Sequence, residues 1–325
     1  MTRGQVQDQQ LPTEDGHQAT LTRLRDQLSS VYFGNATAVH RVLTCLLARG
    51  HLLIEDVPGV GKTVLATALA KSIGGTFARV QCTPDLLPSD ITGVTVFDRE
   101  QNEFRFQQGP IFNNVVVVDE VNRTTPRTQS ALLEAMAEDT VTVDGTTRNL
   151  PTPFMVIATQ NPYEFEGTYF LPENQLDRFL VRISLGYPAP PDEVRIILQQ
   201  PARRELRQLK PVVSAEDIQQ LQDAVDAVHI DQSLVEYVIA LATATREHDD
   251  VQVGVSPRGA LALAQAARAT ALQGDRDFCA PDDVVANVLP VCAHRIICRT
   301  AVHEGDTGTA RRIMQQVLET VPSPA

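Results

Sequence analysis

Apolar residues recur at intervals of three and four between about residues 20 and 49, a spacing that is typical of helices with one buried face. Gly34 and Asn35 interrupt this pattern, so it predicts two helices joined by a turn, and we expect Gly50 to close the second helix. The pattern then predicts a strand over 51–55, a helix over 63–73 and a short strand over 77–82.

Two apolar runs farther along the chain show no alternation of apolar and polar residues. VVVVD at 115–119 and FMVIAT at 154–159 are typical of parallel strands that are covered on both faces. Because such strands alternate with helical segments, the pattern predicts an α/β domain with helices on both sides of a parallel sheet. Two other stretches do alternate, and they predict β-hairpins within 90–109 and 141–150, the second turning at Asp144-Gly145.

Three prolines within GYPAPPDE, at 186–193, indicate a domain boundary, because proline interrupts both helix and sheet. The chain beyond is alanine-rich, and its pattern predicts helices and no strand. Ser256 and Pro257 begin one of these helices, Gly274 ends it, and Pro281 begins another. The predicted organisation is a disordered polar tail at 1–19, an α/β domain at 20–186 and a helical domain at 187–325.

Charge and composition narrow the class of protein. The formal net charge of -12 at pH 7 argues against a nucleic-acid partner. No apolar run approaches the roughly 20 residues that span a bilayer, and the polar first residues lack the apolar core of a signal peptide. These features predict a cytoplasmic protein that does not insert into membranes.

The five cysteines form no C-x-x-C pair, and their odd number favours reduced thiols. Cys292, His294 and Cys298 have a spacing that metal ligands could use, but VLPVCAHRIICR is also the pattern of a helix with an apolar face. We therefore prefer buried thiols to a metal site.

LLIEDVPGVGKT, at 52–63, combines an apolar strand, a glycine-rich turn and a Lys-Thr pair. Backbone N–H groups of such a turn can surround a polyphosphate, and the glycines let the phosphates approach without a Cβ clash. Lys62 would reach the β and γ phosphates, and Thr63 would bind Mg²⁺. Asp56 stands where the pattern G-x-x-x-x-G-K-T has its first glycine, so this motif alone does not decide the function.

An acidic pair and an asparagine follow the two apolar strands. Asp119 would hold the Mg²⁺ shell and Glu120 would polarise an attacking water, although acidic pairs also end many ordinary strands. Asn161 could contact the γ phosphate or that water, and the alternative is a simple turn residue. A guanine site is disfavoured because the D-x-x-G match at 90–93 has no accompanying N-K-x-D, so the sequence favours ATP.

Several segments resemble the signatures of the MoxR-type AAA+ ATPases: EDVPGVGKT, RVQCTPDLLPSDITG, QGPIF, VVVVDEVNRTTPRTQSALLEAM, VTVDG, VIATQNP, LPENQLDRF and SPRGAL. The resemblance covers nearly the whole chain after the tail. It implies a P-loop NTPase core of three αβα layers with a parallel sheet, a helix-2 insert at about 90–109 and an all-α lid domain. That family often carries an acidic residue or a glycine at the position of Asp56.

The resemblance also implies roles for single residues. It places a Walker A motif at 59–63, a Walker B motif at Asp119-Glu120 and sensor 1 at Asn161. Arg178 corresponds to the arginine finger that reaches a neighbouring subunit's nucleotide, and Arg258 corresponds to sensor 2. The residues expected to bind the nucleotide are Gly59, Val60, Gly61, Lys62, Thr63, Val64 and Asp119, with Phe33 and Gly34 beside Tyr32 at the adenine.

When the residues are considered without the family resemblance, some of these roles have alternative interpretations. Arg178 could instead form a surface ion pair with Asp177 or Glu173. The aromatic residues before Gly34 could serve core packing. Arg123 and Arg127 could line a subunit interface or form a solvated basic face.

The function that the resemblance implies is hydrolysis of ATP with Mg²⁺ in a ring of subunits, expected to be a hexamer, that remodels protein clients. The family further implies a partner with a von Willebrand factor A domain. Two alternatives remain at this point: the motor subunit of a metal chelatase, and a nucleotide-gated interaction switch with little turnover. Intact Lys62, Asp119, Glu120 and Arg178 argue against the switch.

Overall fold

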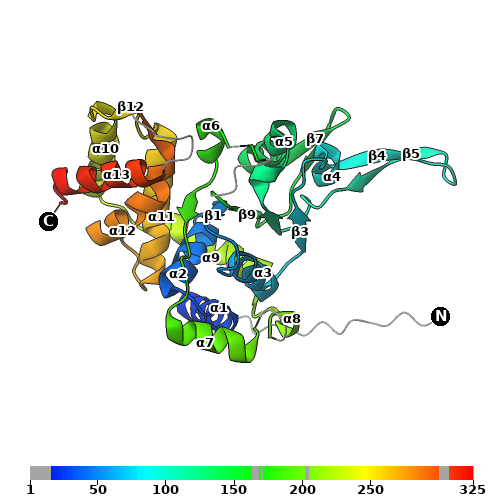
Figure 1. Ribbon diagram of the computed structural model, residues 1–325, viewed down its shortest axis with the longest axis horizontal. Helices are drawn as coiled ribbons and strands as arrows, with labels where there is room; N and C mark the ends of the chain where they lie inside the picture. The colour runs from blue at the N-terminus through cyan, green and yellow to red at the C-terminus, as the bar shows by residue number, and fades with distance from the viewer. Residues whose placement is uncertain (1–15, 163–167, 170, 202–204, 300–306, 325) are drawn as a thin grey trace.

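The computed structural model of the protein describes residues 16–162, 168–169, 171–201, 205–299 and 307–324. Its main sheet is parallel, with the strand order β10-β1-β9-β6-β3 (Figure 1). The strands of this sheet are β1 (Leu52–Glu55), β3 (Phe77–Gln81), β6 (Val115–Asp119), β9 (Met155–Gln160) and β10 (Val181–Ile183). The predicted three-layer α/β architecture is therefore confirmed, and the unbroken apolar runs β6 and β9 lie side by side within the sheet.

Helices cover both faces of this sheet. Side chains of successive strand residues point to opposite faces, and they divide between two buried clusters: Leu52 and Val117 belong to one, Leu53 and Val118 to the other. The first face is covered by α1 (His17–Val31), α2 (Ala36–Leu47) and α3 (Lys62–Ser72), the second by α4 (Pro88–Thr92) and α5 (Pro126–Glu138). Burial on both faces explains why the central strands β6 and β9 do not alternate apolar with polar residues.

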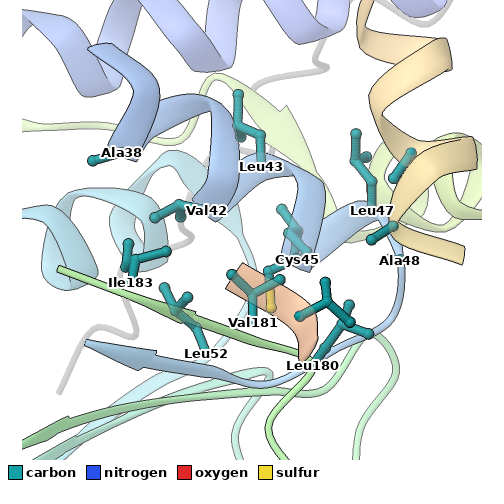
Figure 2. Packing of buried hydrophobic residues seen from close by; sticks show 14 of the residues in the cluster. Ala38, Val42, Leu43, Cys45, Leu47, Ala48, Leu52, Leu180, Val181 and Ile183 are labelled. Carbon is teal, nitrogen blue, oxygen red and sulfur yellow. The ribbon is translucent and has the colours of Figure 1, made fainter. Parts of the chain in front are cut away.

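Figure 2 shows how α2 packs on the sheet. Val42 and Cys45 on α2 lie above Leu52 of β1 and Val181 of β10. These four side chains are at most 1 % exposed, and burial raises the pKa of the Cys45 thiol. Burying an aliphatic side chain of this size contributes about 1.5–3 kcal/mol, so this contact fixes α2 and the chain that follows it relative to β1.

Two hairpins extend from this frame, as the alternating patterns predict. Strands β4 (Gly93–Asp98) and β5 (Glu103–Gln108) pair antiparallel and project away from the rest of the molecule (Figure 1). Strands β7 (Thr140–Val143) and β8 (Thr146–Asn149) form the second hairpin. Its turn has positive φ at both Asp144 (51°) and Gly145 (73°), the conformation that two-residue hairpin turns require.

The C-terminal part is mainly helical. Its helices are α7 (Pro190–Gln199), α8 (Glu205–Gln208), α9 (Ala215–Ala227), α10 (Gln232–Glu247), α11 (Pro257–Gln273), α12 (Pro281–Cys292) and α13 (Thr307–Thr320). As predicted, the Ser256 side chain caps α11 and Gly274 ends it. The larger buried cluster runs from the sheet into these helices, through residues such as Val225, Leu263 and Val288. None of the helices in the described ranges is both long and apolar enough to cross a bilayer.

The structure corrects the expected helix boundaries. Helix α1 begins at His17, inside the stretch assigned to the polar tail, and Gln18 Nε2 donates to the Leu272 carbonyl oxygen at 2.7 Å. Residues 1–15 of that tail lie outside the described residues. Helix α2 is ended by Arg49 at φ 54°, not by Gly50. Gly50 serves close packing, because a Cβ there would lie 2.3 Å from the Leu180 side chain.

The C-terminal part also differs from the expectation that it contains no strand. Short strands occur at β11 (Val213–Ser214), β12 (Val251–Val253) and β13 (Ile297–Cys298). Strand β11 pairs with β2 (Ile73–Gly74), which directly follows α3. Ile73 therefore lies in a strand, although the sequence pattern placed it at the end of the helix predicted over 63–73. Such two- or three-residue strands carry no periodic pattern, so only the contact between distant segments creates them.

Two further predictions about this part need correction. The proline cluster does not exclude a helix, because Pro190 occupies the first turn of α7, where its missing N–H is not needed. The segment with Cys292 and Cys298 is not one helix, since α12 ends at Cys292 and a 3-10 turn, η2 (Ala293–Arg295), follows. Cys298 is only half-buried, whereas the other cysteines are buried thiols.

Candidate nucleotide site

The carboxyl ends of neighbouring strands bring the predicted chemical groups together. The Thr63 hydroxyl, which follows β1, donates to Asp119 Oδ1 at the end of β6 at 3.0 Å. Lys62 Nζ donates to the Gln160 carbonyl oxygen at the end of β9 at 3.0 Å, and also to the Asp56 carbonyl oxygen. Because β9 lies between β1 and β6, the ends of all three strands meet at one edge of the sheet.

The segment 56–63, which we call the glycine turn, has the backbone that a phosphate site needs. Gly59 and Gly61 have φ values of 90° and 96°, which non-glycine residues rarely adopt. Gly61 is also the N-cap of α3, so the positive end of that helix dipole faces the turn. Burial lowers the pKa of Lys62, although the charges of Asp56 and Glu120 oppose the shift.

A cavity of about 430 Å³ adjoins the glycine turn. That volume lies within the usual range of about 300–1,000 Å³ for small-molecule sites. It is lined by Val31, Tyr32, Phe33, Gly59, Val60, Gly61, Val64, Ile196, Gln200 and Pro201. Of the two residues predicted to contact the adenine, Phe33 lines this cavity and Gly34 does not. A Cβ on Gly34 would lie 2.5 Å from the Tyr32 hydroxyl, so Gly34 instead gives room to the Tyr32 ring.

Helix α7 closes one side of this cavity, which the sequence analysis did not anticipate. Ile196 lies on α7, and the Arg195 guanidinium stacks over the Phe33 ring at 4.0 Å from its centroid. A cation over an aromatic face is attracted by the negative charge of the π system. Burial and the Asp56 charge raise the pKa of the Tyr32 hydroxyl to about 12, so this wall of the cavity is uncharged at neutral pH.

The acidic pair is held by groups that sequence reasoning missed. Asp119 is buried, and its carboxylate accepts from Thr159 Oγ1 at 3.2 Å and from Arg79 Nε at 2.7 Å, besides Thr63. Arg79 and Gln81 are two residues apart on β3, the strand beside β6, so they share one face of the sheet. The spacing of two residues on a predicted strand is the sequence signal that could have identified Arg79 and Gln81 as partners of the acidic pair.

Glu120 occupies an unusual backbone conformation. Its φ of 56° is left-handed, which costs a non-glycine residue about 1–3 kcal/mol and is found most often at functional sites. The Glu120 carboxylate accepts from Gln81 Nε2 at 3.1 Å and from Arg123 Nη1 at 2.9 Å. Arg123 therefore contacts the acidic pair, and neither role considered for it from the sequence describes this contact.

The three remaining residues with a predicted catalytic role do not lie together. They are Asn161, Arg178 and Arg258. Asn161 directly follows β9, and its carbonyl oxygen accepts from Asn122 Nδ2 at 3.4 Å. Arg178 follows the short helix α6 (Glu173–Leu176), and Arg258 is exposed in the first turn of α11. Neither arginine lines the cavity beside the glycine turn.

The residues next to both arginines in the chain, Asp177 and Gly259, instead contact Arg295, a buried residue of η2. Arg295 Nε donates to Asp177 Oδ1 at 2.7 Å, and its Cδ lies 3.0 Å from where a Cβ on Gly259 would be. Asp177 is thus engaged by Arg295 and not by Arg178, which excludes one of the two surface ion pairs considered for Arg178. The side chain of the other candidate, Glu173, lies outside the described residues.

Asp56 anchors the glycine turn to the segment that follows β10. Its Oδ2 accepts from the Ser184 hydroxyl at 2.8 Å, the Leu185 N–H at 2.7 Å and the Gly186 N–H at 2.6 Å. Burial by itself would raise the pKa of Asp56, but these hydrogen bonds outweigh burial and lower it. The carboxylate at this position therefore connects the turn to the chain that leads into α7.

Replacing Asp56 with asparagine is expected to reduce the free energy of unfolding by about 2 kcal/mol at pH 7, because the charge-assisted hydrogen bonds are lost. Urea denaturation without nucleotide measures this. Since the folded-state pKa of Asp56 is lowered, the difference is present above its ordinary pKa and disappears as the pH falls through the lowered value. Asp26→Asn, at an exposed position on α1, is the control; equal stability of the two variants would contradict the anchoring role.

The donor set fits a hard divalent cation. The Thr63 hydroxyl and the Asp119 carboxylate are oxygen ligands of the kind that Mg²⁺ prefers. In the part of the chain that the structure describes, no group of three His, Cys, Asp or Glu side chains could hold a metal ion by itself. A cation bound here would therefore need further ligands from water or phosphate, as Mg²⁺ commonly has.

Comparisons with known proteins place this chain in a class. Residues 51–181 match the ATPase family associated with various cellular activities (AAA), and residues 243–317 match an AAA lid domain. A crystal structure of an ATPase candidate from Cytophaga hutchinsonii superimposes with a TM-score of 0.86 at 35% identity, covering 95% of this chain and 96% of that one. The fold is thus that of an AAA+ ATPase with a helical lid.

Similarity to curated proteins shows to which family of AAA+ ATPases the chain belongs. The chain is 46% identical to the YeaC protein of Bacillus subtilis (strain 168), over 96% of this chain and 97% of that protein. It is 39% identical to Chaperone MoxR1 of Mycobacterium tuberculosis, over 94% and 82%, and 31% identical to Protein MoxR of Paracoccus denitrificans, over 93% and 97%. The chain therefore belongs to the MoxR family of AAA+ ATPases.

Proposed function

We propose that this protein binds ATP with Mg²⁺ at the glycine turn and hydrolyses it. The observation that carries the proposal is the contact between Thr63 and Asp119, with Lys62 beside it and Glu120 next in the chain. These groups come from separate strands, and their convergence at one sheet edge is what phosphoryl transfer requires. The adjoining apolar cavity between Phe33 and α7 has the size and lining for a nucleoside.

The roles of the residues follow from their places. The backbone of 59–63 and the Lys62 ammonium would hold the phosphates, and Thr63 and Asp119 would hold the cation. Bound Mg²⁺ would neutralise charge that develops on the phosphate oxygens. Glu120 would accept a proton from the attacking water, and Asn161 would orient that water. Gln81 and Arg123, which contact Glu120, would position its carboxylate.

We further propose that the active site is completed by a second copy of the chain. Neither Arg178 nor Arg258 lines the nucleotide cavity of its own chain, which suits groups that act on a neighbour's nucleotide. The MoxR family supports assembly into a ring, which we propose to be a hexamer. In this arrangement, residues 20–186 form the ATPase core and residues 187–325 the lid.

The cellular role is proposed by relation to the family. One relative is named a chaperone, which supports the remodelling of protein clients by this chain. The hairpin β4–β5 projects from the core and presents an edge-to-face pair, Phe97 and Phe104, with ring centroids 5.2 Å apart. We propose that the protein acts in the cytoplasm with a partner that contains a von Willebrand factor A domain.

Replacing Lys62 with alanine tests the nucleotide site directly. ATP binding, measured by calorimetry with Mg²⁺, is expected to weaken by at least about 100-fold, because a half-buried ammonium that would contact two phosphates is lost. Lys210→Ala, at an exposed lysine outside the site, is the matched control and should bind as the wild type does. Unchanged affinity in Lys62→Ala would rule out the glycine turn as the phosphate site.

A further inference from the structure

A second cavity lies between the α/β part and the C-terminal helices, apart from the glycine turn. Its volume is about 120 Å³, and none of its lining residues lines the nucleotide cavity. Its polar lining residues come from α2, β1, β10, the segment after β10, η2 and α13: Arg41, Glu55, Arg182, Ser184, His294 and Arg311. Strands β1 and β10 and helices α2, α12 and α13 thus all border it.

The charges around this cavity do not balance. Glu55 is its carboxylate, and its two oxygens already accept hydrogen bonds from Arg182 and from Gln160. Arg41 and Arg311 form no ion pair with any side chain in the described ranges, and Arg41 Nη1 donates to the Ala286 carbonyl oxygen at 3.2 Å. Two guanidinium groups without an ion-pair partner in the described ranges, Arg41 half-buried and Arg311 exposed, therefore border one small cavity in a chain whose formal net charge is -12.

The two guanidinium groups are close enough to affect each other. Burial lowers the pKa of Arg41, and the charge of Arg311 lowers it further. Like charges at short range destabilise one another unless an anion lies between them. Arginine in such a cluster commonly binds an oxyanion, because its planar fork matches the geometry of phosphate and carboxylate oxygens.

A buried imidazole adds an unsatisfied polar atom. His294 is 4% exposed, and its Nε2 lies 2.9 Å from both the Phe179 carbonyl oxygen and Arg295 Nη1. Its Nδ1 is buried and has no hydrogen-bond partner among the described residues. Leaving such an atom unpaired costs about 1–3 kcal/mol. The imidazole therefore adds an unpaired polar atom just beneath the lining of this cavity.

We propose that this cavity binds a phosphate ion, held by Arg41 and Arg311, with Arg182, Ser184 and His294 among the residues that line it. Hydrogen phosphate supplies acceptors for the guanidinium groups. A cavity of about 120 Å³ exceeds several-fold the roughly 10–15 Å³ that one water needs, and it is too small for a nucleotide. The bound ion would join α2 and β10 of the α/β part to η2 and α13 of the C-terminal part.

Calorimetric titration of inorganic phosphate into the nucleotide-free full chain tests the proposal. The titrations use the Lys62→Ala background, so that the glycine turn does not contribute. We expect one phosphate per chain, with affinity reduced by at least about tenfold when Arg311→Ala is added. Arg312→Ala is the matched control, since Arg312 is the next residue of α13, is exposed and does not line the cavity; its affinity should not change.

Melting temperatures accompany the titrations. Without phosphate the Arg311→Ala chain should melt no lower than the Arg312→Ala chain, because removing Arg311 relieves its repulsion with Arg41; this shows that the first variant is folded. With phosphate only the second should gain stability, because a ligand that binds the folded state stabilises it. Equal phosphate affinity in the two variants, or no binding in the Lys62→Ala background, would overturn the proposal.

A titration with AMP distinguishes the free ion from the phosphate group of a larger molecule. The cavity volume predicts that AMP binds at least about tenfold more weakly than inorganic phosphate. Binding of AMP without binding of phosphate would also overturn the proposal.

Discussion

Replacing Arg178 with alanine is expected to lower the rate of ATP hydrolysis by about 10³- to 10⁵-fold, which corresponds to about 4–7 kcal/mol of transition-state stabilisation. A guanidinium beside the γ phosphate offsets charge that develops as the phosphoryl group leaves. The neighbouring Asp177 does not compete for Arg178, because its carboxylate accepts from Arg295. Phosphate release from ATP under saturating conditions measures the effect.

The same variant tests whether Arg178 acts on a second copy of the chain. Mixing Arg178→Ala chains with Glu120→Gln chains should restore part of the activity, because a mixed interface can combine an intact Glu120 with an intact Arg178. Each variant alone is the control and should stay inactive at every protein concentration. If mixed assemblies form and no activity returns, Arg178 does not act in the neighbouring site.

Replacing Glu120 with glutamine is expected to leave ATP affinity within about threefold of the wild type and to lower hydrolysis by about 10²- to 10⁴-fold, the usual contribution of a positioned general base. The amide keeps the shape of the side chain but cannot accept the proton from water. Single-turnover measurements with saturating protein separate this loss from any change in binding.

Glu134→Gln provides the matched control for this substitution. Glu134 is an exposed carboxylate on α5, outside the site, so its loss should leave both binding and hydrolysis unchanged. Near-normal hydrolysis by Glu120→Gln would remove the assignment of Glu120 as base and would point to another residue of the strand edge.

Much of the fold could be predicted from the sequence because its elements carry strong local patterns. The valine run of β6 and the apolar run of β9 indicate buried parallel strands, and the Asp144-Gly145 pair indicates a tight hairpin turn. The cap at Ser256 and the stop at Gly274 likewise depend on local chemistry. Predictions failed where the pattern was short, as at β11, or where a left-handed residue was not glycine, as at Arg49.

The candidate site was predictable only in part. The order of Lys62, Thr63 and the acidic pair along the chain indicated which residues carry the chemistry, because each follows an apolar strand. The groups that surround Asp119 and Glu120 were missed, since Arg79 and Gln81 precede β6 by more than thirty residues and come near only because β3 pairs with β6. Helix α7 was assigned to the lid, and its contact with Phe33 was not foreseen.

The sequence by itself determined the strands β1, β3, β6 and β9, the glycine turn and the chemical groups of the proposed ATP site, because period, glycine and charge are local properties. Tertiary structure alone decided which groups meet. Crossover connections give the strand order β10-β1-β9-β6-β3, which brings Thr63 to Asp119 and Arg79 to the same carboxylate. Packing of the C-terminal helices on the sheet likewise brings Arg41 and Arg311 to one cavity, across a sequence separation that no local pattern records.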